Sequence, residues 1–252
     1  MPQSLFEKSS IQRLYTLLKQ QYPQSARFMR DLLTKVEGLY RKTERNRTRS
    51  VFSEIYLNNG WGGQESVSGA GSSLSETVVL RRELPNVFRD LSVSSLLDAP
   101  CGDHFWMKEL PLDFPYIGGD IVRELIYRNR LKYGNPRKTF LVLDITKDRL
   151  PNVHTILCRD CLDHLSFEDA FRALANFKRT GTTYLLATTY KDRTQNDDIA
   201  TGQWRPTNLR LPPFSFPSPK TLIVEECTED DGLWADKSLG VWKLNDLPLS
   251  ER

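Results

Sequence analysis

The chain has 252 residues, 39% of them hydrophobic and 27% charged, and its formal net charge is +3. This length fits one large domain, or one domain with an appendage, and it can bury a core without disulfide bonds or metals. The small net charge argues against nucleic acid or an anionic membrane as the partner. No apolar run approaches the roughly 18 residues that span a bilayer. The N-terminal stretch "MPQSLFEKSSIQRLY" has no apolar segment, so we expect no signal peptide.

Cysteine usage points to a reducing compartment and away from a metal site. The chain has four cysteines, too few for a disulfide scaffold at this length, so we expect a cytoplasmic protein. Cys158 and Cys161 form a C-x-x-C pair, "CRDC". A structural zinc site needs four ligands, and the sequence has neither a second such pair nor histidines at a metal-binding spacing. We therefore expect no metal and no thioredoxin-like redox pair.

The first 57 residues favour helices. Leu14, Leu17 and Leu18 recur at helical spacing. Pro23 separates this stretch from a second one with the same periodicity. We expect an N-terminal helical cap over residues 1–57 that packs on the rest of the chain. A basic arm that binds nucleic acid is the alternative, but acidic residues interrupt its positive charge.

Residues 58–75, "NNGWGGQESVSGAGSSLS", are rich in glycine and serine and cannot form a regular element. Long irregular loops in compact domains are usually functional, so we expect a lid over a cofactor or substrate, with a plain surface loop as the alternative. Ser73 and Glu76 form a capping box, which predicts that a helix begins there. The buried face of this helix is marked by Leu80, Leu84, Phe88 and Leu91.

From residue 93 onward, strand patterns alternate with helical ones. We expect strands over 93–98, 116–120, 139–144, 154–160, 182–190, 221–227 and 239–247. We expect helices over 105–110, 121–134 and 166–181. Alternation of this kind predicts an α/β fold in which a mostly parallel, Rossmann-like sheet of seven strands has helices on both faces. The late strands have no helix between them, so we expect an antiparallel closing strand. This domain would span residues 58–252.

Four consecutive predicted strands end in an aspartate. These residues are Asp98, Asp120, Asp144 and Asp160. In an open α/β sheet, ligands bind beyond the carboxyl ends of the strands, so we expect the four carboxylates on one rim. Carboxylates suit a ligand that is rich in hydroxyl and amine donors, and they repel a bare phosphate. The chain also lacks the phosphate-binding G-x-x-x-x-G-K-[ST] and the dinucleotide fingerprint G-x-G-x-x-G.

The stretches "LLDAPCGDH", "YIGGDIV", "FLVLDIT" and "ILCRDCLDHL" resemble the ordered motif series of class I S-adenosylmethionine-dependent methyltransferases. The resemblance covers roughly residues 93–190. The family's first motif is an acid followed by three alternating glycines. This chain keeps Asp98 and Gly102 but has Pro100 and His104 at the other two glycine positions.

The resemblance implies S-adenosylmethionine as the cofactor. It places the methionine end at Asp98 and at the backbone around Gly102, where a Cβ would clash. It gives the ribose hydroxyls to Asp120 and the adenine to Asp144. The full cofactor set is Trp61, Asp98, Pro100, Cys101, Gly102, Asp120, Ile121, Asp144, Ile145, Cys158 and Arg159. Trp61, in the lid-like loop, would give an aromatic face to the sulfonium.

The same resemblance places the methyl acceptor after the fourth strand, at "RDCLDHL". Asp160 is the first candidate for the base or for orienting the acceptor. His164 is the second, because its pKa normally lies near working pH. Packing against the cofactor is the alternative for His164. The family's N-methylating tetrapeptide is absent, which argues against methylation of nucleic-acid amines.

Further acceptor contacts are expected from Asp163 and from the Pro-rich segment 191–220, which would form an acceptor-side insertion. That segment offers Asn196, Trp204, Arg205 and Asn208 as hydrogen-bonding groups and an aromatic platform. A solvated helix-start acid is the alternative for Asp163, and a surface excursion is the alternative for the segment.

The sequence thus predicts a methyltransferase that O-methylates a hydroxyl of a small polar or sugar-like (glycan) acceptor by in-line transfer. One alternative is an N-methyltransferase acting on a small amine or a protein side chain. Another is a non-catalytic partner protein that binds S-adenosylmethionine. We expect no membrane span and no nucleic-acid partner, and we leave open whether the protein forms a homodimer.

Overall fold

The structure, a computed structural model, describes residues 47–249. Residues 1–46, most of the predicted helical cap, lie outside this range. Residues 47–57 are helical, and the compact unit that contains the sheet begins at Thr48. This helix packs within that unit, because Arg49 Nε donates a hydrogen bond to the Ile121 carbonyl (3.3 Å). The last part of the predicted cap therefore belongs to the main domain.

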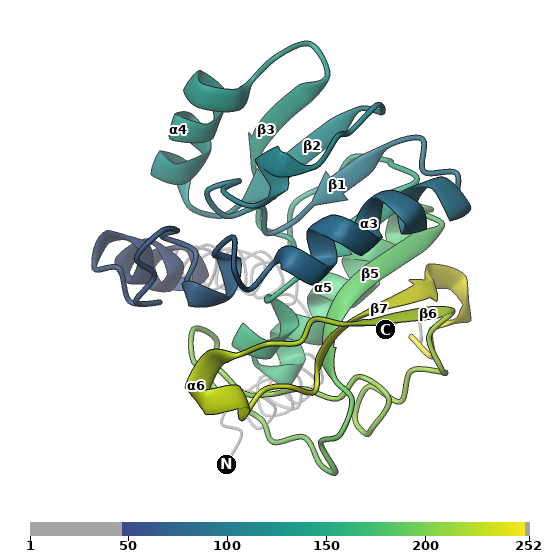
Figure 1. The fold of residues 1–252 in the computed structure, drawn as a ribbon. Helices are drawn as coiled ribbons and strands as arrows, with labels where there is room; N and C mark the ends of the chain where they lie inside the picture. The colour runs from purple at the N-terminus through teal and green to yellow at the C-terminus, as the bar shows by residue number, and fades with distance from the viewer. Residues whose placement is uncertain (1–46, 250–252) are drawn as a thin grey trace, which may run out of the picture. The chain divides into compact units, whose positions relative to one another are not determined.

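Within residues 47–249, a seven-stranded sheet has the order β3-β2-β1-β4-β5-β7-β6. Figure 1 labels all of its strands except β4. Its strands are β1 (Leu96–Asp98), β2 (Tyr116–Asp120), β3 (Lys138–Val142), β4 (Thr155–Cys158), β5 (Tyr184–Tyr190), β6 (Thr221–Val224) and β7 (Lys237–Lys243). The first five strands run parallel, and β7 is antiparallel to both β5 and β6. The predicted α/β class, the strand number and the antiparallel closure are confirmed.

Helices cover both faces of the sheet because each carries an apolar stripe. Helices α3 (Val78–Asp90) and α4 (Arg123–Tyr133) contribute to one core cluster, and α5 (Phe167–Arg179) contributes to the other. The central strands are apolar on both sides: all four residues of β4 are buried. The predicted cap of α5 is present, since the Ser166 hydroxyl accepts a hydrogen bond from the Asp169 N–H (3.2 Å).

The predicted start of α3 is wrong by a few residues. The Ser73 hydroxyl does accept the Glu76 N–H (3.2 Å), but the Glu76 side chain bonds to Thr228 instead of completing the capping box. The chain therefore makes a turn, and α3 begins at Val78. The predicted buried face of the helix is correct.

The predicted helix over 105–110 is also wrong. Only a 3-10 turn, Met107–Glu109, forms there, because the proline at 111 forces the preceding residue into an extended conformation. The other short helices are Ala70–Ser72, Leu162–His164 and Leu244–Asp246 (3-10) and α6 (Glu229–Gly232). None of the helices in residues 47–249 combines the length and the apolar character that a bilayer crossing needs.

Candidate cofactor and acceptor site

The carboxyl ends of β1–β4 form one edge of the sheet and carry the four predicted aspartates. Asp98 and Asp120 are the last residues of β1 and β2, and Asp144 and Asp160 follow β3 and β4 by two residues. Because β1 lies between β2 and β4, Asp98 lies between Asp120 and the end of β4. Asp98, Asp120 and Asp144 are buried, whereas the side chain of Asp160 is 23% exposed.

Asp98 and Asp120 are buried acids with no ion pair within the described range. Asp98 Oδ2 accepts a hydrogen bond from the Tyr116 hydroxyl (2.6 Å). Asp120 accepts the N–H groups of Gly102 (3.2 Å) and Val122 (2.9 Å), one on each oxygen. Burial raises the pKa of Asp98 to about 7 and the pKa of Asp120 to about 6. Each oxygen of Asp120 keeps a lone pair that a ligand hydroxyl can use.

The turn after β1 requires the glycine at position 102. Gly102 has φ +52°, and a Cβ there would lie 2.2 Å from Ser68 Oγ. Ser68 belongs to the predicted lid loop, which is fixed to this turn through Asp103. The Asp103 carboxylate accepts hydrogen bonds from the Ser66 hydroxyl (2.9 Å) and the Val67 N–H (3.1 Å). The loop thus lies against the turn, and its opening and closing remain a prediction.

His104, at a position where the methyltransferase resemblance led us to expect glycine, adopts the left-handed conformation with φ +60°. Its side chain is buried beneath the turn, against Tyr116 and Phe140, and does not enter the ligand side. Burial lowers its pKa to about 3, and nearby Lys138 adds to the effect, so the ring is neutral. The departure from the family motif is accommodated in the core.

Asp144 has one satisfied and one unsatisfied oxygen. Oδ1 accepts hydrogen bonds from Thr146, from its N–H (3.0 Å) and its hydroxyl (2.6 Å). Oδ2 is buried and has no hydrogen-bond partner in the part of the chain that the structure describes. Lys147 Nζ lies 3.9 Å from it. A buried acceptor without a donor is costly, so this oxygen fits a ligand amino group.

Asp160 has a different environment. Its carboxylate lies 3.0 Å from the Arg159 guanidinium and 2.8 Å from Lys237 Nζ. Burial would raise the pKa of Asp160, but the two cations outweigh burial and hold the pKa at about 2. A carboxylate with so low a pKa is a poor proton acceptor at neutral pH, which argues against Asp160 as the base.

The side chain of Arg159 is held in a buried ion network. It donates to Glu225 (2.7 Å) and to the Gly71 carbonyl of the lid loop (2.8 Å). Sequence reasoning missed Glu225 and Lys237, because nothing near residue 159 signals partners more than sixty residues away. Any contact of Arg159 with the cofactor is therefore left to its backbone.

His164 is brought together with Trp61. The two rings have centroids 4.3 Å apart. His164 Nδ1 lies 3.1 Å from the Gln203 carbonyl, which can only accept, so we assign the proton to Nδ1. Nε2 is then left as an unprotonated acceptor. The lid loop and the end of β4 thus place an indole ring beside an imidazole ring.

Asp163 is buried, which excludes the reading of a solvated helix-start acid. Its Oδ2 accepts a hydrogen bond from the Trp204 indole (3.2 Å), and burial raises its pKa. Its Oδ1 has no hydrogen-bond partner within residues 47–249. Trp204 is partly exposed and packs edge to face on Trp234 (4.7 Å between centroids), which sequence reasoning missed.

Three predicted acceptor residues have structural contacts instead. The Arg205 guanidinium is buried and donates to the carbonyl of Leu165 (2.7 Å). The amides of Asn196 and Asn208 bond to main-chain groups of the segment 191–212. These contacts fold the segment, so a role of these side chains in acceptor binding stays a prediction that the geometry does not favour.

The remaining predicted residues lie at the same edge. Cys101 and Cys158 are buried, and all four cysteines are free thiols. Pro100 belongs to the turn after β1, and Ile121 and Ile145 follow β2 and β3 as half-buried residues. The C-x-x-C pair, Cys158 and Cys161, is buried beneath the site.

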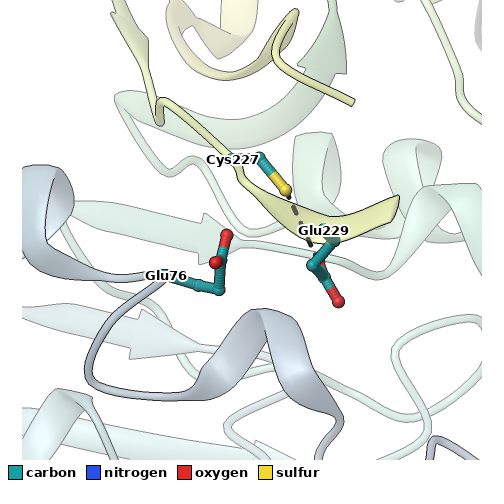
Figure 2. A group of neighbouring side chains, drawn as sticks. All are labelled: Glu76, Cys227 and Glu229. Carbon is teal, nitrogen blue, oxygen red and sulfur yellow. Dashed lines mark hydrogen bonds between the residues drawn. The ribbon is translucent and has the colours of Figure 1, made fainter. Parts of the chain in front are cut away.

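A second group, Glu76, Cys227 and Glu229, lies where the start of α3 meets the loop before α6 (Figure 2). Its three ligand atoms lie within 4.8 Å of one another. Thr228 already donates to both oxygens of Glu76, and the Cys227 thiol donates to Glu229 (3.5 Å). Burial raises the pKa of Cys227 to about 12, which disfavours the thiolate that a metal needs. We assign no ion to this group.

No protein-family model and no curated protein sequence matches the chain. Among solved structures, one that matches is a Burkholderia thailandensis 1,6-didemethyltoxoflavin-N1-methyltransferase with bound substrate and S-adenosylhomocysteine. The TM-score is 0.52 at 14% identity, over 80% of this chain and 89% of that one. The fold is that of class I methyltransferases.

Human N-acetylserotonin methyltransferase, crystallised with S-adenosylmethionine, also matches this methyltransferase fold, with a TM-score of 0.51 at 13% identity. The match covers 77% of this chain but only 58% of the human enzyme. Identity this low establishes the architecture alone. The chemistry must be argued from the residues of this chain.

Proposed function

We propose that this protein is an S-adenosylmethionine-dependent methyltransferase. The observation that carries the proposal is the set of three buried carboxylates at the ends of three adjacent parallel strands. Asp98 and Asp120 form no ion pair with a residue in the described range, and Asp144 has one oxygen without a hydrogen-bond partner there. Three such acceptors match a ligand with an ammonium group, two ribose hydroxyls and an adenine amino group.

These residues fit the cofactor in a fixed order along the edge. Asp144 would accept the adenine amino group, Asp120 the ribose hydroxyls, and Asp98 the cationic methionine end. S-adenosylmethionine would supply an electrophilic methyl group on its sulfonium. The lid loop, fixed over the turn by Asp103, would exclude water from this side.

The acceptor would bind beyond β4, next to His164 and Trp61. His164 Nε2 would take the proton of the acceptor hydroxyl, and Trp61 would limit the position of the imidazole. Asp160, fixed by Arg159 and Lys237, would orient the acceptor and stay ionised. In-line transfer needs this positioning more than it needs any covalent chemistry from the protein.

We infer that the acceptor is a small polar or sugar-like molecule with a hydroxyl. The partly exposed indole of Trp204 suits a molecule with an apolar face, and the buried Oδ1 of Asp163, which has no donor within residues 47–249, suits a hydroxyl donor. N-methylation of a small amine is the second candidate, because the matching Burkholderia protein is an N1-methyltransferase. A cytoplasmic location stays a prediction.

Calorimetric titration with S-adenosylmethionine and S-adenosylhomocysteine tests the proposal. We expect the wild type to bind both, and Asp120→Asn to lose at least tenfold in affinity, since a hydrogen bond to a charged group contributes about 1.5–3 kcal/mol. Asp113→Asn is the matched control, because Asp113 is an exposed acid just before β2. Binding of neither ligand by folded wild-type protein would refute the proposal.

If the cofactor binds, a screen of sugars, phenols and amines decides the acceptor class. Transfer to a hydroxyl supports O-methylation, and transfer to amines alone would replace it with N-methylation. Cofactor binding without turnover on any acceptor would favour the non-catalytic alternative.

A further inference from the structure

A chain of polar groups runs beneath the turn after β1, from the half-buried Lys138 through the buried His104 and Tyr116 to the buried Asp98. Lys138 Nζ lies 3.5 Å from His104 Nε2. His104 Nδ1 lies 3.0 Å from the Tyr116 hydroxyl, which in turn lies 2.6 Å from Asp98 Oδ2. No role in the proposed transfer has been given to His104, Tyr116 or Lys138.

The direction of these hydrogen bonds follows from their chemistry. Lys138 can only donate, so His104 Nε2 accepts and the ring proton lies on Nδ1. Nδ1–H then donates to the Tyr116 oxygen. The one hydroxyl proton of Tyr116 is left for the Asp98 carboxylate. Every group points its donor toward Asp98, so the chain stabilises the ionised form of that acid.

The burial of the chain indicates that the Tyr116 hydroxyl has a purpose beyond packing. His104 and Tyr116 are each 1% exposed and pack against the ring of Phe140. That phenylalanine shows that an apolar ring fits this layer. A hydroxyl and an imidazole in such a place cost free energy unless they are paired. Within the part of the chain that the structure describes, they are paired only with each other and with Asp98 and Lys138.

Several charged groups face this chain. Asp98 is approached by Asp120 at the end of β2, by Arg159 at the end of β4 and by the Cys101 thiol in the turn. Lys138 on β3 and Lys108 in the 3-10 turn act on His104. Burial raises the pKa of Asp98 to about 7, with Asp120 adding to the rise and Tyr116 and Arg159 opposing it. The Asp98 carboxyl is therefore partly ionised and partly protonated near neutral pH.

Asp98 has one oxygen left for a ligand. Oδ2 is used by Tyr116, and Oδ1 makes no hydrogen bond to any residue in the range 47–249. Asp98 lies between the acid assigned to the ribose and the end of β4. A ligand whose ribose binds at Asp120 would thus bring its amino-acid end to Asp98.

We propose that Tyr116 and His104 are positioning residues that favour the ionised form of Asp98 and orient it toward the ammonium group of the cofactor. The proposal rests on the proposed function, because it needs S-adenosylmethionine as the ligand. A consequence is that the affinity of the protein for the amino-acid end of the cofactor depends on pH, because Asp98 binds the ammonium group only when it is ionised.

Two ligands and a matched pair of variants test this proposal. S-adenosylhomocysteine carries the amino-acid end, whereas 5′-methylthioadenosine has the same ribose and adenine without it. Tyr116→Phe removes the hydroxyl that bonds to Asp98. Tyr133→Phe is the control, since Tyr133 also packs on His104 but is not bonded to Asp98. Affinities are measured by calorimetry between about pH 5.5 and 8.5, around the reference pKa range of the groups involved.

We expect Tyr116→Phe to weaken S-adenosylhomocysteine binding about fivefold at pH 7, if the pKa of Asp98 rises by about one unit. The loss should shrink to less than about twofold at pH 8.5, where Asp98 is charged in both proteins. Binding of 5′-methylthioadenosine should not change, and Tyr133→Phe should bind both ligands as the wild type does.

An equal loss at every pH, or an equal loss for both ligands, would overturn the proposal, because it would mean that Tyr116 only supports the fold. Unchanged binding in Tyr116→Phe would overturn it as well. Failure of the wild type to bind either ligand would instead refute the proposed function, and the positioning role with it.

A measurement on the wild type keeps the proposal testable if Tyr116→Phe does not fold. The chain has three histidines, so their ring signals can be assigned in long-range 1H–15N spectra. We expect His104 to stay neutral with its proton on Nδ1 from about pH 5 to 8. A proton on Nε2, or a ring that titrates in this range, would overturn the proposed direction of the chain.

Discussion

The carboxylates at the ends of β1 and β2 and the carboxylate after β4 lie on the same edge of the sheet, in opposite electrostatic settings. Asp98 and Asp120 are buried and form no ion pair within residues 47–249, and burial raises the pKa of each. Asp160 is paired with two cations, which lower its pKa to about 2. The first group can gain from a ligand that brings positive charge and donors. The charge of Asp160 is already neutralised by Arg159 and Lys237, so Asp160 can orient a ligand but does not need a positively charged ligand to stabilise it.

This difference favours a cofactor-binding role for the β1–β3 side and an acceptor-binding role for the β4 side. The β1–β3 side is left with unmet acceptors, as expected of a site that a donor-rich cofactor completes. The β4 side is rigid and satisfied around Asp160, and the group left free to accept a proton is His164. Four predictions can break or sharpen this comparison, taken here from the largest expected effect to the smallest.

The largest effect should come from His164→Gln. Loss of a positioned base lowers the rate of methyl transfer by about a hundred- to ten-thousandfold, while cofactor affinity changes little. Single-turnover assays with the identified acceptor, beside calorimetry for the cofactor, measure the two separately. A variant that keeps its rate would remove His164 from the chemistry and return attention to Asp160.

Arg159→Met should destabilise the fold most. It leaves the buried Glu225, and Asp160 beside it, without their guanidinium partner, and breaking a buried pair from one side costs about 3–5 kcal/mol. Urea unfolding measures the loss. The double variant Arg159→Met with Glu225→Gln should recover part of it, and a single variant as stable as the wild type would contradict the proposed network.

Asp98→Asn and Asp160→Asn should shift stability in opposite directions at pH 8. The pKa of Asp98 is raised on folding, so its ionised form costs stability as pH rises from about 4 through 7, and the amide should gain about 4 kcal/mol. The pKa of Asp160 is lowered, so its contribution is present above about pH 4 and is lost as pH falls toward 2.

Unfolding curves at pH 5 and pH 8 check both signs. Asp98→Asn should also bind S-adenosylhomocysteine more weakly than the wild type. This would show that the Asp98 carboxylate lowers the stability of the fold but raises the affinity for the ligand. The same direction of change in both variants would contradict the electrostatic difference between the two sides of the edge.

The smallest effect should come from Gly102→Ala. Its Cβ would meet Ser68 at positive φ, so we expect a loss of about 2 kcal/mol in stability and a displaced lid loop. Gly181→Ala is the matched control, because Gly181 has φ +72° but no atom within 4 Å of its Cβ, and only the backbone strain of about 1 kcal/mol remains. Equal losses of stability in the two variants would show that the contact between the lid loop and the turn adds nothing to the backbone strain.

The sequence predicted the sheet, and the placement of three aspartates at one edge of it, because both depend on local signals. Each of Asp98, Asp120 and Asp144 stands at or just after an apolar strand, and the parallel order brings them together. The start of α3 was misplaced because the Glu76 side chain bonds to Thr228, a partner 152 residues away that no local pattern announces.

The acceptor side was predicted less well for the same reason. The pairing of Asp160 with Lys237 joins residues 77 positions apart, so its low pKa could not be expected. Arg205 and Asn208 are polar residues in a long segment, and the sequence does not tell a folding role from a binding role for them. Their side chains bond to main-chain carbonyls, which become visible only once the segment is folded.

A crystal structure with S-adenosylhomocysteine tests the central claim most directly. The account predicts the adenine amino group at Asp144 Oδ2, the ribose hydroxyls at Asp120 and the ammonium group at Asp98. A ligand bound elsewhere, or crystals that stay empty at saturating ligand, would contradict it.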